Sequence, residues 1–178
     1  MATTIKQNES EPLTYPDAPE GLSAAAVAIP APVIWERIEA YVAHRWAERD
    51  IEWLVEGPGE WSPPLAPATI ATVEVWSAAD EWEACTPNAS PFGGYWLSAT
   101  GPFRFTGTVG PGEVPATVSE AYRRLAEYMA AKPGKPGATS ESIDAGSISI
   151  SHSRSASWLA NAMINSGAGD LLRSYRKV

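Results

Sequence analysis

The sequence contains little cysteine and histidine, and this limits the chemistry that it can support. Cys85 is the only cysteine, so an internal disulfide and a thiolate zinc cluster are both excluded. The two histidines, His44 and His152, have no acidic partner at ligand spacing, which argues against a metal site or a catalytic triad. We interpret His44 as an exposed surface residue and Cys85 as a buried, inert thiol. The sequence therefore predicts a protein that is not an enzyme and needs no cofactor or metal.

Long apolar runs and an excess of positive charge are also missing. No stretch approaches eighteen apolar residues and the first residues are polar, so we expect neither a membrane span nor a signal peptide. The net charge of −8 argues against a phosphate-binding surface over most of the fold. The charge is uneven, because residues 17–60 are acidic while Arg173, Arg176 and Lys177 make the C-terminus basic. These features indicate a soluble, cytosolic protein.

Proline and glycine are abundant, with 16 and 14 residues in a chain of 178. The length suits one domain with extensions, and the two residue types favour turns, arms and linkers. Residues 1–32 contain five prolines and no sustained apolar period, which predicts an extended N-terminal arm held by a neighbouring subunit. Within it, residues 24–28 can form one turn of helix before Pro30 and Pro32 stop it.

Apolar residues at helical spacing predict three helices, over residues 33–49, 116–131 and 155–166. In the first helix Trp46 belongs to the apolar stripe, and Arg45 and Arg49 belong to the solvent-facing side. In the second, Pro115 suits the first turn and Glu120 lies four residues before Arg124, a favourable exposed pair. The apolar stripe of that helix comprises Val118, Ala121, Tyr122, Leu125 and Met129.

Between the first two helices the period changes to two, which predicts an inserted meander of about five short antiparallel strands over residues 51–109. The fold class is therefore α+β, a small helical core with a β insertion. The inward-facing residues of this sheet are predicted to include Trp53, Val55, Val73 and Val75.

Most of the tryptophans lie in this insertion, which leaves a second reading open. Exposed tryptophan faces can stack on sugars, and glycoside hydrolysis would need two carboxylates across a cleft. The candidate carboxylates are Glu52, Glu56, Glu74 and Glu81. Their alternation with apolar neighbours favours the solvent face of a sheet, and we interpret the tryptophans as core or interface residues.

Residues 133–153 are rich in Gly, Ser and Pro and predict a flexible linker, in which residues 147–151 alternate and can add to a sheet as an edge strand. The segment after it, residues 154–178, carries more apolar bulk than a solvated tail needs. We interpret it as a docking segment for a partner protein that stands apart from the core; the alternative is packing on the core of its own subunit. Its predicted contact residues are Trp158, Leu159, Met163, Leu171, Leu172, Arg173, Tyr175, Arg176 and Lys177.

Five pieces occur in a characteristic order: IWERIEAYVAHRW, EWLVEGPGEWSPPLAPATI, FGGYWLSATGPFRFTGTVG, VPATVSEAYRRLAEYMA and SWLANAMINSGAGDLLRSYR. Together they span roughly residues 33–176, and the most distinctive are GPFRFTGTVG leading into a helix and the ending SGA-x-x-LL-x-x-YR. In this order the sequence resembles the head–tail connector (adaptor) proteins of long-tailed phages and of related gene transfer agents. It departs from them in its long Pro-rich arm, where many relatives have an additional helix.

The resemblance implies a virion structural protein of the neck, assembled in the host cytoplasm. In that family a helical core with a β insertion forms a homo-oligomeric ring, usually twelve-fold, below the portal protein, and DNA passes through its lumen without specific binding. The C-terminal segment reaches into the portal, so the contact residues listed above become the predicted portal-binding site. The insertion faces neighbouring subunits or the next tail component, a stopper or tail terminator. The alternative function is a Trp-rich, tail-associated module that binds carbohydrate or acts on the cell wall.

Overall fold

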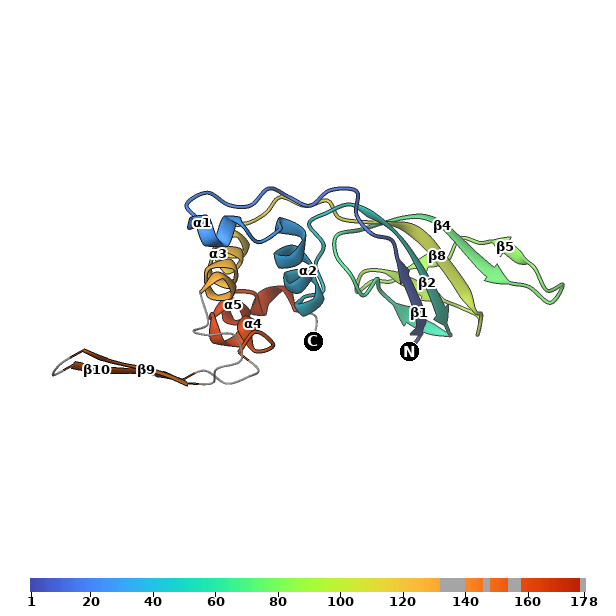
Figure 1. The fold of residues 1–178 in the computed structure, drawn as a ribbon. Coiled ribbons are helices and arrows are strands. Elements are labelled where there is room, and N and C mark those ends of the chain that lie inside the picture. The colour runs from blue at the N-terminus through green and yellow to red at the C-terminus, as the bar shows by residue number, and fades with distance from the viewer. Residues whose placement is uncertain (132–139, 146–147, 154–157, 177–178) are drawn as a thin grey trace. The chain divides into compact units, whose positions relative to one another are not determined.

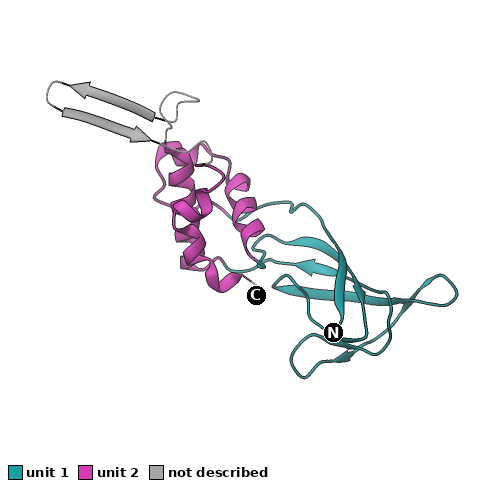
Figure 2. Cartoon of the chain, turned by 90° about the horizontal axis from the view of Figure 1, so that it is seen from below, with its two compact units in different colours: residues 1–16, 43–113, 177 teal, residues 17–42, 114–176, 178 magenta. Residues whose placement is uncertain are grey.

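The computed structural model describes residues 1–131, 140–145, 148–153 and 158–176, which combine helices with antiparallel sheets (Figure 1). This mixture agrees with the predicted α+β class. The chain divides into two compact units (Figure 2). Unit 1 contains residues 1–16 and 43–113 and all strands of the two larger sheets. Unit 2 contains residues 17–42 and the described part of 114–176, and it includes the helices.

Unit 1 is built on a five-stranded antiparallel sheet with the strand order β1-β2-β8-β4-β5. Its strands are β1 (Thr3–Glu9), β2 (Arg49–Glu56), β4 (Ala68–Trp76), β5 (Trp82–Ala84) and β8 (Phe103–Val109). A second sheet has the order β3-β7-β6. Its strands are β3 (Gly59–Trp61), β6 (Asn88–Ala89) and β7 (Tyr95–Leu97). Because β8 lies between β2 and β4, the insertion is not the simple meander that the sequence predicted.

The core of unit 1 forms where the alternating apolar residues of β2 meet those of β8. Trp53 and Val55 are fully buried, as predicted, and Trp53 is the Cα partner of Phe105 across the sheet. Trp61 covers both, with its ring centroid 5.8 Å from Trp53 and 4.3 Å from Phe105. On β4 the predicted inward residues Val73 and Val75 are only partly buried. An aromatic cluster therefore holds the centre of the sheet.

The N-terminal segment departs from its prediction as an arm without regular structure. Residues Thr3–Glu9 form β1, which pairs with β2 of the same chain, and Ala2 is buried in the core of unit 1. The sequence TTIKQNE does not alternate in polarity, because this edge strand contacts its neighbour largely through polar side chains. The turn of helix predicted within the arm is present as α1 (Ala24–Val27), with Ser23 as its N-cap.

Unit 2 is helical, and α3 (Ala116–Ala130) agrees closely with its prediction. Residues 158–161 form turns, and the other helices are short. They are α2 (Ala31–Tyr41), α4 (Ala162–Asn165), α5 (Ala168–Leu171) and the 3-10 helix η1 (Arg173–Tyr175). The predicted helix over residues 155–166 is thus wrong in extent, and residues 154–157 lie outside the described residues. None of the helices in the described ranges has the length and apolar character needed to cross a bilayer.

The first predicted helix, residues 33–49, ends eight residues early, at Tyr41. The residues after it belong to unit 1: His44 forms a parallel bridge with Ala66, and the Arg45 amide donates to the Ala66 carbonyl at 2.8 Å. Trp46 continues the helical spacing by coincidence and is buried in an irregular segment. Tertiary contacts to the sheet have overridden a helical pattern.

Part of the predicted linker forms a hairpin, in which β9 (Ser140–Ala145) pairs with β10 (Ile148–Ser153). Residues 148–151 of the predicted edge strand thus find their neighbour in their own chain. The linker residues 133–139 and 146–147 lie outside the described residues.

Candidate functional site

Helix α3 is the platform on which the predicted portal-binding segment lies. Four of the five residues in its predicted apolar stripe are buried, among them Val118, Ala121 and Leu125 at 0% exposure, while Met129 is half-buried. Burial also raises the pKa of Tyr122, whose ring lies 5.1 Å from that of Trp35 on α2. On the outer side, hydrogen bonds from Arg124 and Arg123 hold the pKa of Glu120 below its ordinary value. The platform is therefore an amphipathic helix with its polar side toward solvent.

The C-terminal segment packs on this platform through small residues and one leucine. Leu172 and Ala168 are fully buried, and α5 contacts both α3 and α4. Gly167 joins α4 to α5 with a φ of 74°, a left-handed conformation that glycine adopts without steric cost. At Gly169 a Cβ atom would lie 2.9 Å from the hydroxyl of Tyr41 and 3.2 Å from the Met163 carbonyl oxygen, so a larger residue would have to displace one of these neighbours. The expectation that the segment stands apart from the core is wrong. In the structure the segment packs on α3 of its own subunit.

Hydrogen bonds and contacts with aromatic rings also attach the C-terminal segment to α2 and α3. The Arg37 guanidinium donates to the Leu159 carbonyl at 3.0 Å, and Arg176 lies over the Tyr41 ring at 4.8 Å from its centroid. The Asn165 side-chain amide donates to the Tyr128 hydroxyl at 3.1 Å. The ring of Tyr128 in turn lies 5.6 Å from that of Trp158. Aromatic rings of both helices therefore meet residues of the segment.

These contacts divide the predicted site residues into inner and outer groups. Leu172 is fully buried, and the half-buried members are Trp158, Met163, Leu171 and Tyr175. The exposed members are Leu159, Arg173 and Arg176, with 40% of Leu159 accessible. Lys177 lies outside the described residues. Sequence reasoning missed Ile164, whose side chain is 71% exposed on α4 opposite the buried Ala162. In this fold, a partner can reach Leu159, Ile164, Arg173 and Arg176 without unfolding the segment.

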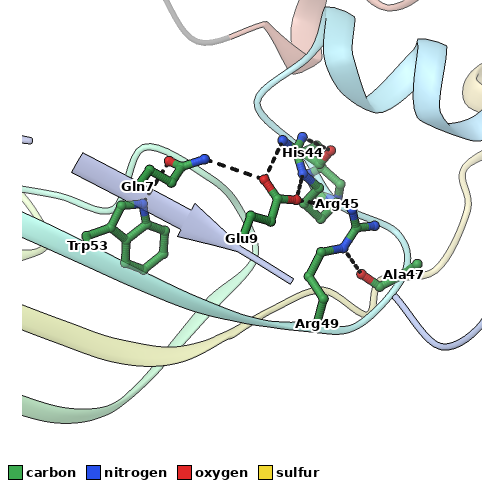
Figure 3. A network of polar contacts seen from close by, with 7 residues as sticks. All are labelled: Gln7, Glu9, His44, Arg45, Ala47, Arg49 and Trp53. Atoms are coloured by element: carbon green, nitrogen blue, oxygen red, sulfur yellow. Dashed lines mark hydrogen bonds and ion pairs between the residues drawn. The ribbon is translucent and has the colours of Figure 1, made fainter. Parts of the chain in front are cut away.

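A second cluster, in unit 1, was not expected from the sequence (Figure 3). Glu9, the last residue of β1, accepts from two arginines, at 2.5 Å from Arg45 Nε and 3.1 Å from Arg49 Nη1. The side chains of Arg45, Arg49 and Glu9 are only 11%, 6% and 19% exposed. The predicted solvent-facing arginines are therefore buried in an ion-pair cluster. Sequence spacing gave no signal for it, because Glu9 is 36 residues from Arg45 and 40 from Arg49.

Beside Glu9, each neighbouring polar residue of β1 also reaches a specific partner. Gln7 accepts from the Trp53 indole at 2.8 Å, as Figure 3 shows, and Asn8 donates to Glu52 at 2.8 Å. Nearer the N-terminus, Thr4 accepts from the Trp61 indole at 2.8 Å. Four side chains of one short strand thus fix its register on the unit 1 sheet.

His44 adjoins this cluster and is half-buried, which corrects its prediction as an exposed residue. Its ring lies 4.7 Å from that of Trp46. Burial, with the neighbouring positive charge of Arg45, lowers the pKa of His44 below its ordinary value of 6.5. The fold therefore favours the neutral imidazole.

The carboxylates considered for sugar chemistry lie on strands and loops as ordinary surface groups. Glu74 forms an ion pair with Arg104 at 2.6 Å, and Arg104 also covers the ring of Trp82 at 4.5 Å. Glu56 and Glu81 are exposed. Among the described residues, no group of three His, Cys, Asp or Glu side chains is arranged to hold a metal ion.

The thiol of Cys85 is half-buried, and burial together with the charge of Glu74 raises its pKa. A raised pKa keeps the thiol protonated and therefore poorly nucleophilic. Its interpretation as an inert side chain agrees with this environment.

Comparisons of the chain with protein-family models, with curated proteins and with solved structures found no match.

Proposed function

We propose that the chain is a virion structural protein, a head–tail adaptor that forms a ring between the portal of the capsid and the tail. DNA passes through the lumen of this ring without specific binding. The proposal starts from the sequence resemblance, since fold alone would not indicate a function.

One structural observation supports the proposal. The strands of residues 43–113 form one unit together with β1, and between α2 and α3 the chain runs through this unit. A helical unit interrupted by a β insertion between its two main helices is the arrangement that the resemblance implies. The proposed ring is homo-oligomeric, with twelve copies as the expected number, and the β insertion contacts neighbouring copies or the next tail component, a stopper or tail terminator.

The portal-binding surface that we propose is narrower than the one read from the sequence. Exposed Leu159, Ile164, Arg173 and Arg176 contact the portal, while buried Leu172 anchors the segment to α3. Apolar side chains next to arginines are typical of the contact residues that dominate protein interfaces. Deleting residues 170–178 would also remove Leu172 from the core, so point substitutions on the exposed side chains give the cleaner test.

The decisive experiment replaces Leu159 by Ser and Arg173 by Glu in one chain and assembles it with the portal protein of the same particle. We expect a folded protein by circular dichroism that no longer joins portals in native mass spectrometry, and DNA-filled heads without tails in particles. A matched control is Arg124→Glu, which reverses the charge of an exposed arginine on α3 and should leave joining intact. Normal tailed particles from the double variant would contradict the portal-binding surface. Heads that gain tails in the absence of the chain would contradict the adaptor function itself.

A further inference from the structure

Strand β1 is an edge strand, and this gives it a freedom that the inner strands β2, β8 and β4 of its sheet lack. It pairs on one side only, with β2, and the sheet order places no further strand beyond it. An edge strand can be replaced by an equivalent strand while every other strand keeps its neighbours.

The edge of β2 nevertheless requires a strand with this particular sequence. Without β1, Arg45 and Arg49 would lose the carboxylate of Glu9, and the indole N–H groups of Trp53 and Trp61 would lose the acceptors Gln7 and Thr4. Breaking a buried ion pair and removing the acceptor of a buried donor are both costly. Since the required contacts come from Thr4, Gln7 and Glu9, the edge accepts this segment in one register. Every copy of the chain carries the same segment.

The chain that follows β1 is suited to reaching another molecule. From Glu9 to α1 the described residues form no helix or strand, and Pro12, Pro16 and Pro19 disfavour both. Residues up to Pro16 belong to unit 1, where Arg49 lies 5.6 Å from the Tyr15 ring centroid. In unit 2, Ser23 is fixed by hydrogen bonds to Glu127 at 2.6 and 2.8 Å. The Arg123 guanidinium also donates to the Glu20 carbonyl at 3.0 Å, so residues 17–19 lie between the two attachments and can span about 10 Å when extended.

We propose that β1 is the exchangeable joint between copies of this chain: in the assembled ring, Thr3–Glu9 of one copy pairs with β2 of its neighbour. This inference rests on the proposed ring. Exchange within a closed ring keeps every contact of the strand and adds a link between subunits, because each copy gives one strand and receives one. The Glu9 cluster then contains a carboxylate from one copy and two guanidiniums from the next.

The experiment uses two single-cysteine chains, Asn8→Cys and Glu52→Cys, both in a Cys85→Ser background. Asn8 and Glu52 are directly opposite each other in the register of β1 on β2, so a disulfide between the two chains forms only when the strand of one pairs with the sheet of the other. The chains carry different tags, are mixed before assembly on the portal and are oxidised mildly. With equal amounts of the two chains, the cysteines meet at about one junction in four, so we expect about half of the chains in the ring to run as disulfide-linked heterodimers without reductant. The dilute monomeric mixture should stay unlinked.

Two controls make the result decisive. One chain that carries both cysteines should close an internal disulfide as a monomer, which shows that the geometry permits the bond. Replacing the Glu52→Cys chain by Thr72→Cys, a residue of β4 rather than β2, should abolish the heterodimer. Rings that assemble but give no Asn8–Glu52 link overturn strand exchange and leave the adaptor function standing. If no ring forms on the portal, both proposals fall.

Discussion

The two units of this chain are stabilised by different means. Unit 1 depends on strands far apart in sequence, on buried aromatic rings and on a largely buried ion-pair cluster. Unit 2 depends on one amphipathic helix, on close packing of small residues and on exposed ion pairs such as Asp170–Arg173, whose side chains are 74% and 80% exposed. Exposed pairs contribute little to stability, whereas emptied aromatic sites and broken buried pairs are costly. Single side chains should therefore matter most in unit 1.

The largest expected effect is that of Trp53→Ala. The side chain is fully buried between β8 and Trp61, and emptying such a site costs about 3–5 kcal/mol of unfolding free energy. Denaturant unfolding measures the cost, and hydrogen exchange locates it: amides of β2 and β8 should exchange faster while those of α3 do not. Trp96→Ala, at a ring 47% exposed, is the matched control and should cost much less. Equal acceleration in α3 would show that the two units unfold together.

Next in size is Glu9→Gln, which removes the negative charge that Glu9 presents to the buried Arg45 and Arg49. We expect a loss of roughly 2–3 kcal/mol, below the full range for broken buried pairs because Glu9 keeps 19% exposure. Asp170→Asn breaks an exposed pair of similar length in unit 2, and it should change the free energy of unfolding by about 0.5 kcal/mol or less. Similar losses for both variants would mean that burial does not distinguish the ion pairs of the two units.

A smaller cost is expected where unit 2 is most closely packed. Gly169→Ala places a methyl group against the Tyr41 hydroxyl and should cost about 1–3 kcal/mol, as overpacking usually does. Tyr41→Phe removes the hydroxyl, so the alanine should cost less in that background. A double-mutant cycle measured by thermal unfolding tests this coupling. If the free-energy changes of Gly169→Ala and Tyr41→Phe are additive, the cost of the alanine does not come from contact with the Tyr41 hydroxyl.

The smallest effect is a pH dependence that comes from His44. Because the fold lowers the pKa of this residue, the unfolded chain binds more protons below pH 6.5, and unfolding becomes easier as the pH falls from there toward the lowered pKa. Above pH 6.5 the contribution is constant. His44→Gln should flatten the unfolding free energy between pH 7 and pH 5.5 relative to the natural chain, and denaturant titrations at each pH measure this. If the unfolding free energy of His44→Gln changes with pH as steeply as that of the natural chain, the pH dependence comes from other titratable groups.

Sequence reasoning succeeded where a local pattern and the tertiary fold agree. The stripe of α3 and the alternation of β2 are periodic over enough residues to determine both the element and its buried face. It failed where contacts between residues far apart in the sequence determine the local structure. Trp46 fits a helical stripe but is buried outside any helix, and β1 has no apolar alternation because polar side chains fix its register. In the C-terminal segment the buried Leu172 and the exposed Ile164 are both apolar, and only packing on α3 separates them.

The position of β1 has a consequence for how the protein is made. A ribosome finishes β1 at Glu9, but β2 begins only at Arg49, so at about 5–20 residues per second the strand waits for seconds before its partner exists. A nascent strand of apolar residues would be prone to aggregate during that time. With Thr, Lys, Gln, Asn and Glu at all but one of its positions, β1 stays solvated instead. Strand β1 therefore reaches the sheet late and as a hydrated strand.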